Sequence, residues 1–452
     1  MEDVKALQLL ARLDRIPIWP YSYWIIFTVG AGFFFAFFDI ITIGLALPII
    51  AKQFQVSTAV VLWAITSGLI GYIIGSFLDS RLSDLLGRKL ALIVSMLLFS
   101  IGSLLSATSP NITWLIIWRF IIGTGIGAEI ANVTTYIGEL APASCRGRYA
   151  SITIAAGFIG FAVVPFIGLA LIPNFAWGWR ALFACGALGG FLILFCRRYI
   201  PNSIRWQINH QHYEIAEQEL LKAENIAIKR LKKNLPTPTD IVNLSIKITK
   251  TRFIDLFRPP YLNKIIFFAV IWLIYYLGNY GWLALSTNLF LSEGFDLTKS
   301  LALVATNSLG FVIGSVLAIF LGDKFERKQT ISVTALIWAI ALLFVAWLPH
   351  LFCILIFGCL ATTTIALVVP LLYIYTAESF PTSCRATGVS ITDGVGHLSA
   401  AFCGQIILGI AGLFTASGYS SAIGFTIMAI TGLLTSILIL FGSKMTGKQL
   451  HQ

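Results

Sequence analysis

Three ionisable residues stand inside long apolar stretches in the first half of the sequence: Asp39, Arg119 and Glu129. A charge at membrane depth is expensive, so such residues are by default functional. At ~1.5 Å per helical residue, Asp39 and Arg119 lie roughly 13 and 10 Å from the same membrane face, so their side chains can meet. A carboxylate beside a guanidinium can take up and release a proton, because protonation removes half of the ion pair. We therefore predict a proton-coupling pair, with a permanent salt bridge as the alternative.

Glu129 follows Arg119 by ten residues, which is ~15 Å along one helix. At ~100° per residue its side chain is turned roughly 80° away from Arg119. We predict that Glu129 relays a proton inward or meets a cationic group of a substrate; a hydrogen-bonded acid at a helix contact is the alternative. The intervening Gly123, Gly125 and Gly127 favour close helix packing.

The second half offers aromatic and amide groups of the kind that bind organic substrates. One apolar stretch carries five such side chains within eight residues: Tyr275, Tyr276, Asn279, Tyr280 and Trp282. We expect Gly278 and Gly281 to interrupt that helix, and discontinuous helices form binding sites in transporters. The alternative for the outer rings of this stretch is an interfacial aromatic belt.

Another apolar stretch carries Asp393 and His397, whose four-residue spacing places them on one helical face. Both are candidate substrate contacts, although Asp393 can also cap its helix and His397 can be a hydrogen-bonded interior imidazole. Asn132 and Asn307 are weaker candidates for the same cavity.

Composition indicates which elements hold these residues. Hydrophobic residues make up 58% of the 452, charged residues only 11%, and the mean hydropathy is +0.87. A soluble chain of this length needs a more charged surface. A membrane span needs roughly 20 apolar residues, and it must be helical because lipid offers no partner to an open backbone. Twelve stretches qualify: 22–48, 59–79, 90–108, 112–137, 150–171, 178–197, 263–290, 298–321, 330–348, 351–376, 387–413 and 418–441.

The basic residues predict the orientation. Of 31 Lys and Arg, 27 fall on the side of the N-terminus, three fall on the other side, and Arg119 is buried. The positive-inside rule then places both termini in the cytoplasm. The basic residues are spread over loops and do not form one groove, so nucleic-acid binding is excluded. Short external loops favour the cytoplasmic membrane of a prokaryote. No cleavable signal peptide is visible, because the first apolar stretch is long enough to span the membrane.

The sequence also repeats itself at an offset of 239 residues, since the stretch 136–151 matches 375–390 and 71–89 matches 310–328. We therefore predict an all-α membrane protein of twelve transmembrane helices in two pseudo-symmetric six-helix bundles, with a substrate site between the halves. The predicted parts are a cytoplasmic arm (1–21), a first bundle (22–197), a cytoplasmic middle loop (198–262), a second bundle (263–441) and a cytoplasmic tail (442–452).

Both copies of the repeat carry the same charges in their inner loops. Asp39 and Arg119, by contrast, have Gly278 and Gly358 at the repeated positions. Charges that occur in both halves are more typical of a gate or a structural brace than of a substrate-binding site. We predict salt bridges that close the inner side in the outward-facing state, each of about 0–1 kcal/mol but together able to bias two conformations. The residues are Asp84, Arg88, Glu139, Arg146, Asp323, Arg327, Glu378 and Arg385.

The polar middle loop contains one predicted helix, 204–233, with acids early and bases late, as the helix dipole prefers. A solvated tether between the halves is the favoured interpretation, and a latch is the alternative.

These motifs resemble those of the major facilitator superfamily over essentially the full chain. The family's loop signature, G-x-L-a-D-r-x-G-r-k, has Ser80 at its leading glycine and Leu85 at its first basic position here. The segment 119–129, RFIIGTGIGAE, is similar to the fourth helix of metabolite:proton symporters and niacin or organic-solute transporters, which carry an acid where Glu129 stands. Sugar porters share the segment 139–148, ELAPASCRGR, but the paired glutamines of their span seven are absent. The resemblance implies transport by alternating access, and symporters of these groups have an aspartate and an arginine at the places of Asp39 and Arg119.

We therefore expect a proton-coupled symporter of a small organic metabolite, with a sugar:proton symporter, a proton-coupled exporter or a transporter-like nutrient sensor as alternatives. The sequence contains no P-loop, metal-ligand cluster or nucleophile elbow, so no enzyme activity, metal or cofactor is expected and the proton gradient is the energy source. The expected partners are a small-molecule substrate, protons and the lipid bilayer, and the expected state is a monomer.

Overall fold

The computed structural model describes residues 2–142, 144–196, 200–238, 256–259, 261–321, 324–380 and 385–444. Eleven of its helices are long and apolar enough to cross a membrane, and Gly178–Leu194 is a shorter apolar helix. Together they account for the twelve predicted spans. Those of the first half are α2 (Tyr23–Gln53), α3 (Thr58–Leu86), α4 (Arg88–Ala107), α5 (Ile112–Leu140), α6 (Arg146–Leu171) and the pair α7 (Gly178–Gly186) and α8 (Leu188–Cys196).

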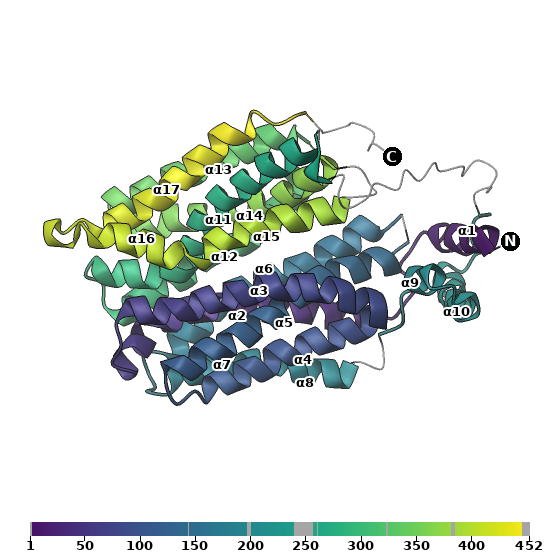
Figure 1. Ribbon diagram of the computed structural model, residues 1–452, viewed down its shortest axis with the longest axis horizontal. Coiled ribbons are helices and arrows are strands. Elements are labelled where there is room, and N and C mark those ends of the chain that lie inside the picture. The colour runs from purple at the N-terminus through teal and green to yellow at the C-terminus, as the bar shows by residue number, and fades with distance from the viewer. Residues whose placement is uncertain are drawn as a thin grey trace.

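The second half repeats this order. Its spans are α11 (Tyr261–Ser292), α12 (Leu297–Leu321), α13 (Arg327–Trp347), α14 (Leu351–Glu378), the pair α15 (Arg385–Ala401) and α16 (Cys403–Gly412), and α17 (Ser420–Ile439), with a 3-10 turn η4 (Thr415–Ser417) before α17. Figure 1 shows the second half, green to yellow, above the first half, purple to teal.

The predicted interruption of α11 is wrong, because the helix runs unbroken through both glycines. Its glycines are packing points instead. A Cβ at Gly278 would lie 2.0 Å from Thr431 Oγ1, and one at Gly281 would lie 2.4 Å from Ile407 Cδ1. The broken spans are the sixth and the eleventh.

Glycines also bring α5 against α3, as the sequence predicts. A Cβ at Gly123 would lie 1.8 Å from the main-chain oxygen of Gly68, and one at Gly127 would lie 2.0 Å from that of Tyr72. The two backbones are therefore in contact along the stretch that separates Arg119 from Glu129.

The halves meet through polar contacts that preserve the repeat. Thr66 Oγ1 on α3 donates to the main-chain oxygen of Ala401 at 2.7 Å, and Ser308 Oγ on α12 donates to that of Ala162 at 2.9 Å. The two acceptors are 239 residues apart, so they are the same position in the two halves. Between these contacts α2 packs on α11, where a Cβ at Gly44 would lie 2.8 Å from the Leu283 main-chain oxygen.

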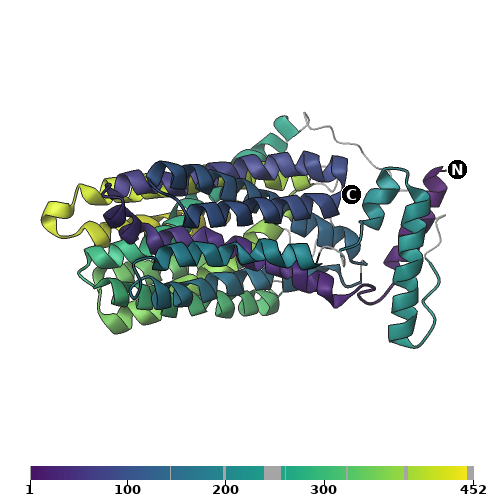
Figure 2. The same ribbon diagram turned by 90° about the horizontal axis from the view of Figure 1, so that it is seen from below.

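Three helices outside the spans gather at one end of the bundle, which we call the basic end. They are α1 (Glu2–Asp14), α9 (Ile204–Asn209) and α10 (Tyr213–Leu231), and Figure 2 shows α10 lying across that end. The prediction of one helix over 204–233 is wrong, because two helices occupy this stretch. Gln211 has φ 62°, a left-handed backbone conformation that separates α9 from α10. The chain reverses there, and the His212 N–H donates to the main-chain oxygen of Gln207 at 2.9 Å.

Helix α10 is attached to α1 by an ion cluster. Glu224, only 6% exposed, accepts hydrogen bonds from Arg12 and Arg15, each at 2.7 Å. Burial alone would raise the pKa of Glu224, but the hydrogen bonds from the two arginines outweigh it and hold that pKa below its ordinary value of 4.5. Apolar residues of both helices, such as Leu13 and Leu220, complete the contact.

Glu224→Gln is expected to loosen α1 from α10 by about 2 kcal/mol, because it removes the charge that two arginines share. Since the folded-state pKa is lowered, the contact is complete above the ordinary value of 4.5 and is lost as pH falls through the lower folded pKa. Hydrogen exchange of the α10 amides measures the change. Glu219→Gln, a more exposed acid paired with Lys222, is the control; equal exchange in both variants contradicts the prediction.

Candidate functional site

Asp39 lies in the middle of α2, is fully buried, and is held by the neighbouring helix α4. Its Oδ2 accepts a hydrogen bond from Ser103 Oγ at 2.6 Å, while Oδ1 has no partner in the described structure. The space around Oδ1 exists because residue 186 is a glycine: a Cβ at Gly186 would lie 2.6 Å from that oxygen. One oxygen of the carboxyl group is thus held and the other remains available.

Arg119 on α5 reaches the same residue by a different route. Its Nη1 donates to the main-chain oxygen of Asp39 at 3.1 Å, and the structure shows no ion pair between the two side chains themselves. Among the residues that the structure describes, the buried Nε of Arg119 has no hydrogen-bond partner. Phe183 covers one side of the guanidinium at 5.8 Å. The structure therefore brings the two predicted residues together and leaves hydrogen-bonding capacity on both.

Glu129 lies further along α5 in a second, similar setting. Its Oε2 accepts a short hydrogen bond from Ser95, also on α4, and its buried Oε1 has no partner in the described part of the chain. Gly32 on α2 provides the room, because a Cβ there would lie 2.2 Å from Oε1. The two acids therefore repeat one arrangement: serine on α4, glycine opposite, one oxygen free.

The candidates of the second half form a hydrogen-bonded cluster. The Asp393 carboxylate on α15 accepts from Tyr276 on α11 at 2.9 Å and from Tyr373 on α14. The Nδ1 of His397 donates to the main-chain oxygen of Asp393 at 2.9 Å. In the neutral ring this leaves Nε2 to accept from the Tyr280 hydroxyl, 3.1 Å away.

A ring of the first half also joins this cluster. Tyr72 on α3 stacks on His397 with centroids 4.1 Å apart, and Tyr276 meets the same imidazole edge-on at 4.6 Å. We call Tyr72, Tyr276, Tyr280, Tyr373, Asp393 and His397 the tyrosine–histidine cluster.

The repeat shows what is special about this cluster. Residues 239 positions away from Tyr72, His397 and Tyr276 are Phe311, Phe158 and Phe37. They make the same contacts at the opposite interface, with Phe158 6.2 Å from Phe311 and 5.8 Å from Phe37. One interface between the halves is thus polar and the other is its apolar counterpart, which points to a specific task for the polar one.

A small cavity joins the two candidate regions. Its volume is about 30 Å³, and Arg119 of the first half and Tyr280 of the second half both line it. The remaining walls are apolar apart from Tyr72: Ile40, Ile43, Ile65, Gly68, Leu69, Gly123, Ile126, Leu283 and Ala284. The guanidinium and the tyrosine–histidine cluster therefore face one space between the halves.

Other predicted substrate contacts lie elsewhere. Tyr275 donates to the main-chain oxygen of Ile365 at 3.4 Å. Asn279 is buried, and its amide oxygen has no partner among the described residues. Asn307 lines a separate cavity of about 10 Å³, and neither amide atom has a partner in the described structure. Asn132 bonds Ser83 at the basic end, and the structure does not bring it to the cluster.

The predicted loop charges pair within each half. Arg88 binds Asp84 at 2.7 Å and Glu139 at 3.0 Å, and the repeated arginine, Arg327, binds Glu378 at 2.6 Å. Arg385 Nε donates to the Phe380 main-chain oxygen at 3.4 Å. Asp323 and the side chain of Arg146 lie outside the described residues. The symmetry matches the expectation, and the gating role stays a prediction.

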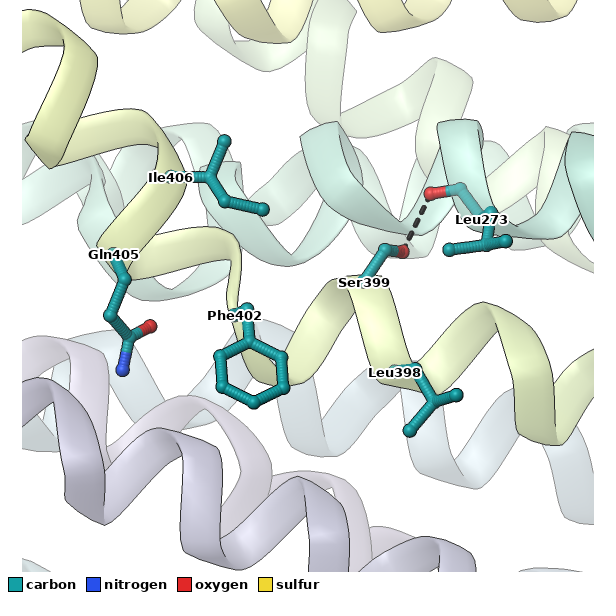
Figure 3. A pocket seen from close by; sticks show the side chains of 6 residues that line it. All are labelled: Leu273, Leu398, Ser399, Phe402, Gln405 and Ile406. Carbon is teal, nitrogen blue, oxygen red and sulfur yellow. Dashed lines mark hydrogen bonds between the residues drawn. The ribbon is translucent and has the colours of Figure 1, made fainter.

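A larger pocket of about 510 Å³ opens beside the break between α15 and α16, lined by Leu273, Leu398, Ser399, Phe402, Gln405 and Ile406. Figure 3 shows Ser399 bonded to the Leu273 main-chain oxygen, at 2.6 Å, and Gln405 directed toward the helices of the first half. Gln405 Nε2 donates to Thr66 Oγ1 at 2.7 Å, so this side chain is already used as a contact between the halves.

Several residues of the site escaped the sequence analysis. Ser95 and Ser103 carry no charge, although their eight-residue spacing puts them on one face of a helix. Tyr72 and Tyr373 lie among apolar residues in the sequence, and only their contacts in the folded structure identify them as members of the site. The second span is predicted to end at residue 79, whereas α3 continues to Leu86, which places Asp79 inside the helix.

His397→Phe is expected to keep the fold, because phenylalanine fills the repeated position, Phe158. It is expected to raise the KM of uptake about tenfold, the effect of one lost hydrogen bond near the cavity. Phe158→Leu at the apolar interface is the control and is expected to leave KM within about twofold. A KM that rises equally in both variants would assign His397 to packing alone.

Comparison with known proteins agrees with this architecture. Residues 29–402 match the Major Facilitator Superfamily. A Bacillus subtilis protein named for metabolite transport, YyaJ, is 29% identical over 97% of this chain and 96% of its own length. The niacin transporter NiaP of Acinetobacter baylyi is 24% identical over 98% of this chain and 99% of its own. Among solved structures, a D-xylose-proton symporter superposes with a TM-score of 0.74 at 21% identity, over 95% of this chain and 100% of that one. This chain is a multi-pass integral membrane protein, and it belongs to the Major Facilitator Superfamily of transporters.

Proposed function

We propose that this chain carries a small organic acid across the membrane together with protons, by alternating access, with its basic end in the cytoplasm. The observation that carries the proposal is the arrangement of Asp39 and Arg119: two buried, oppositely charged groups with unused hydrogen-bonding capacity, the second of which lines a cavity between the halves.

The arrangement supports coupling of two ligands. When Asp39 is ionised, its carboxylate attracts the guanidinium of Arg119. When Asp39 is protonated, its hydrogen bond with Ser103 remains, and Arg119 loses that competing charge. Arg119 is then free to bind an anion. Protonation of Asp39 and binding of a carboxylate by Arg119 thus strengthen each other, and such positive coupling between the two ligands is the requirement for symport.

The chemistry of the cavity favours a flat carboxylic acid. A guanidinium binds a carboxylate through two parallel hydrogen bonds. Tyr72 and Tyr280 line the same cavity and present aromatic faces against which a ring can pack. The relative NiaP is named as a niacin transporter, and niacin is a flat aromatic carboxylic acid. This supports aromatic acids over hexoses as the substrate class.

Alternating access follows from the size of the cavity. A volume of about 30 Å³ holds about one water and no metabolite. The halves must therefore separate for a substrate to reach Arg119, and the short contacts at Ala162 and Ala401 are candidates for the ones that break and re-form.

The test is uptake by the full-length protein in proteoliposomes under an imposed pH gradient. Nicotinate, benzoate, amino acids and hexoses are compared, with protein-free vesicles and a protonophore as controls. We expect accumulation of an aromatic acid that the protonophore abolishes. Accumulation of a hexose favours the sugar symporter, gradient-driven extrusion favours an exporter, and absence of flux for every solute class favours a sensor.

A further inference from the structure

A third buried acid lies on α3, at about the level of Glu129 on α5. Asp79 on α3 is 3% exposed, and its Oδ1 has no partner in the described structure. Like Asp39 and Glu129, it belongs to the first half alone: the repeated positions of the three acids are Gly278, Val368 and Ala318, for Asp39, Glu129 and Asp79 respectively. Groups that brace both halves are repeated, and these three are not.

The depth of Asp79 follows from its neighbours. Ser83 Oγ donates to Asn132 Oδ1 at 3.2 Å, which fixes the register of α3 against α5. Asp79 precedes Ser83 by four residues and Glu129 precedes Asn132 by three, so on these two helices the acids lie about one turn from that contact. Both therefore lie at about the same level of the bundle.

The surroundings of Asp79 are charged on both sides. Asp79 lies within electrostatic range of Glu129 on α5. Asp79 in turn lies within electrostatic range of Arg88, at the start of α4, and of Asp84, on its own helix. It thus stands between a buried acid and the charged network of the basic end.

The spacing of the earlier acids supports a continuous series. Gly32 and Asp39 are seven residues apart on α2, and Ser95 and Ser103 are eight apart on α4. Gly32 and Ser95 lie beside Glu129, whereas Ser103 binds Asp39. The carboxyl groups of Glu129 and Asp39 are therefore separated by seven or eight residues along these helices, which is roughly 10–12 Å. Asp79 to Asp84 adds about 7.5 Å toward the basic end.

We propose that Asp79 is the proton acceptor that follows Glu129, and that it releases the proton at the basic end. This inference rests on the proposed proton coupling. In each step one proton leaves a carboxylic acid and joins a carboxylate, so the two sites exchange their charge and no further reactant is needed. The oxygens without partners on Asp79 and Glu129 are the atoms that give and take the proton. A purely bracing acid would instead have its oxygens satisfied, as Glu139 does by Arg88 and Ser203.

The test separates net proton movement from substrate movement. Asp79→Asn is expected to lower accumulation driven by a pH gradient at least tenfold. Exchange of labelled for unlabelled substrate across equilibrated vesicles is expected to stay within twofold, since exchange needs no proton release. Asp79→Glu restores a carboxyl group and is expected to recover accumulation. Asp296→Asn, an exposed acid that caps α12, is the control, because asparagine caps equally well.

The outcomes distinguish this inference from the proposed function. Normal accumulation by Asp79→Asn, together with loss in Asp39→Asn, overturns the role of Asp79 and leaves proton coupling intact. Normal accumulation by both variants overturns the coupling itself. Asp79→Ser guards against a fold defect: loss of exchange in both Asp79→Asn and Asp79→Ser makes Asp79 a structural residue and also overturns the proposal.

Discussion

Asp39→Asn is expected to reduce accumulation against a gradient to the level of protein-free vesicles, the largest effect of any single change in this chain. Asparagine is close in size, and its amide oxygen can still accept from Ser103, so the packing at Gly186 is preserved. It cannot bind and release a proton, however. Symport therefore becomes, at most, facilitated movement down the gradient.

The measurement is the ratio of internal to external substrate at steady state under an inward proton gradient. Asp296→Asn carries the same chemical change at an exposed position and is expected to match the wild type. A ratio clearly above one in Asp39→Asn would falsify the assignment of coupling to this residue.

Arg119→Gln is expected to have the second largest effect, a rise in the KM for the organic acid of about 100-fold. Loss of a charge-assisted bidentate pair removes about 3 kcal/mol of binding, and each 1.4 kcal/mol is about tenfold. Glutamine cannot present the two parallel donors of Arg119.

The amide of the same substrate makes this prediction specific. If Arg119 binds the carboxylate, Arg119→Gln should weaken the acid far more than the amide, and selectivity between them should fall. Arg119→Lys keeps the charge without the fork and is expected to lie between the wild type and Arg119→Gln. Equal losses for acid and amide would show that Arg119 maintains the fold and does not recognise the substrate.

Two side chains illustrate how far the sequence predicts the site. Asp39 and Arg119 could be singled out because a charge inside an apolar stretch is unusual, and helical rise alone placed them at similar depth. Their geometry was not predictable. The guanidinium reaches the backbone of Asp39, and Ser103 takes the carboxylate, because side-chain partners depend on how three helices pack.

Gly278 illustrates the opposite case. A glycine in a spanning helix predicts either a break or a close contact, and the local sequence does not distinguish them. In the structure Gly278 is pressed against Thr431 and Trp338, and α11 stays continuous. The breaks fall in α7–α8 and α15–α16 instead.

Hydropathy and the internal repeat are sufficient to assign the class of the molecule. Twelve helical spans in two related halves follow from hydropathy and the 239-residue offset, since lipid leaves the backbone no alternative to the helix. Which residues act together depends instead on how the helices pack. Tyr72 and His397 are 325 positions apart in the chain and stack at 4.1 Å. Such a contact depends on the packing of one half against the other, which neither periodicity nor composition encodes.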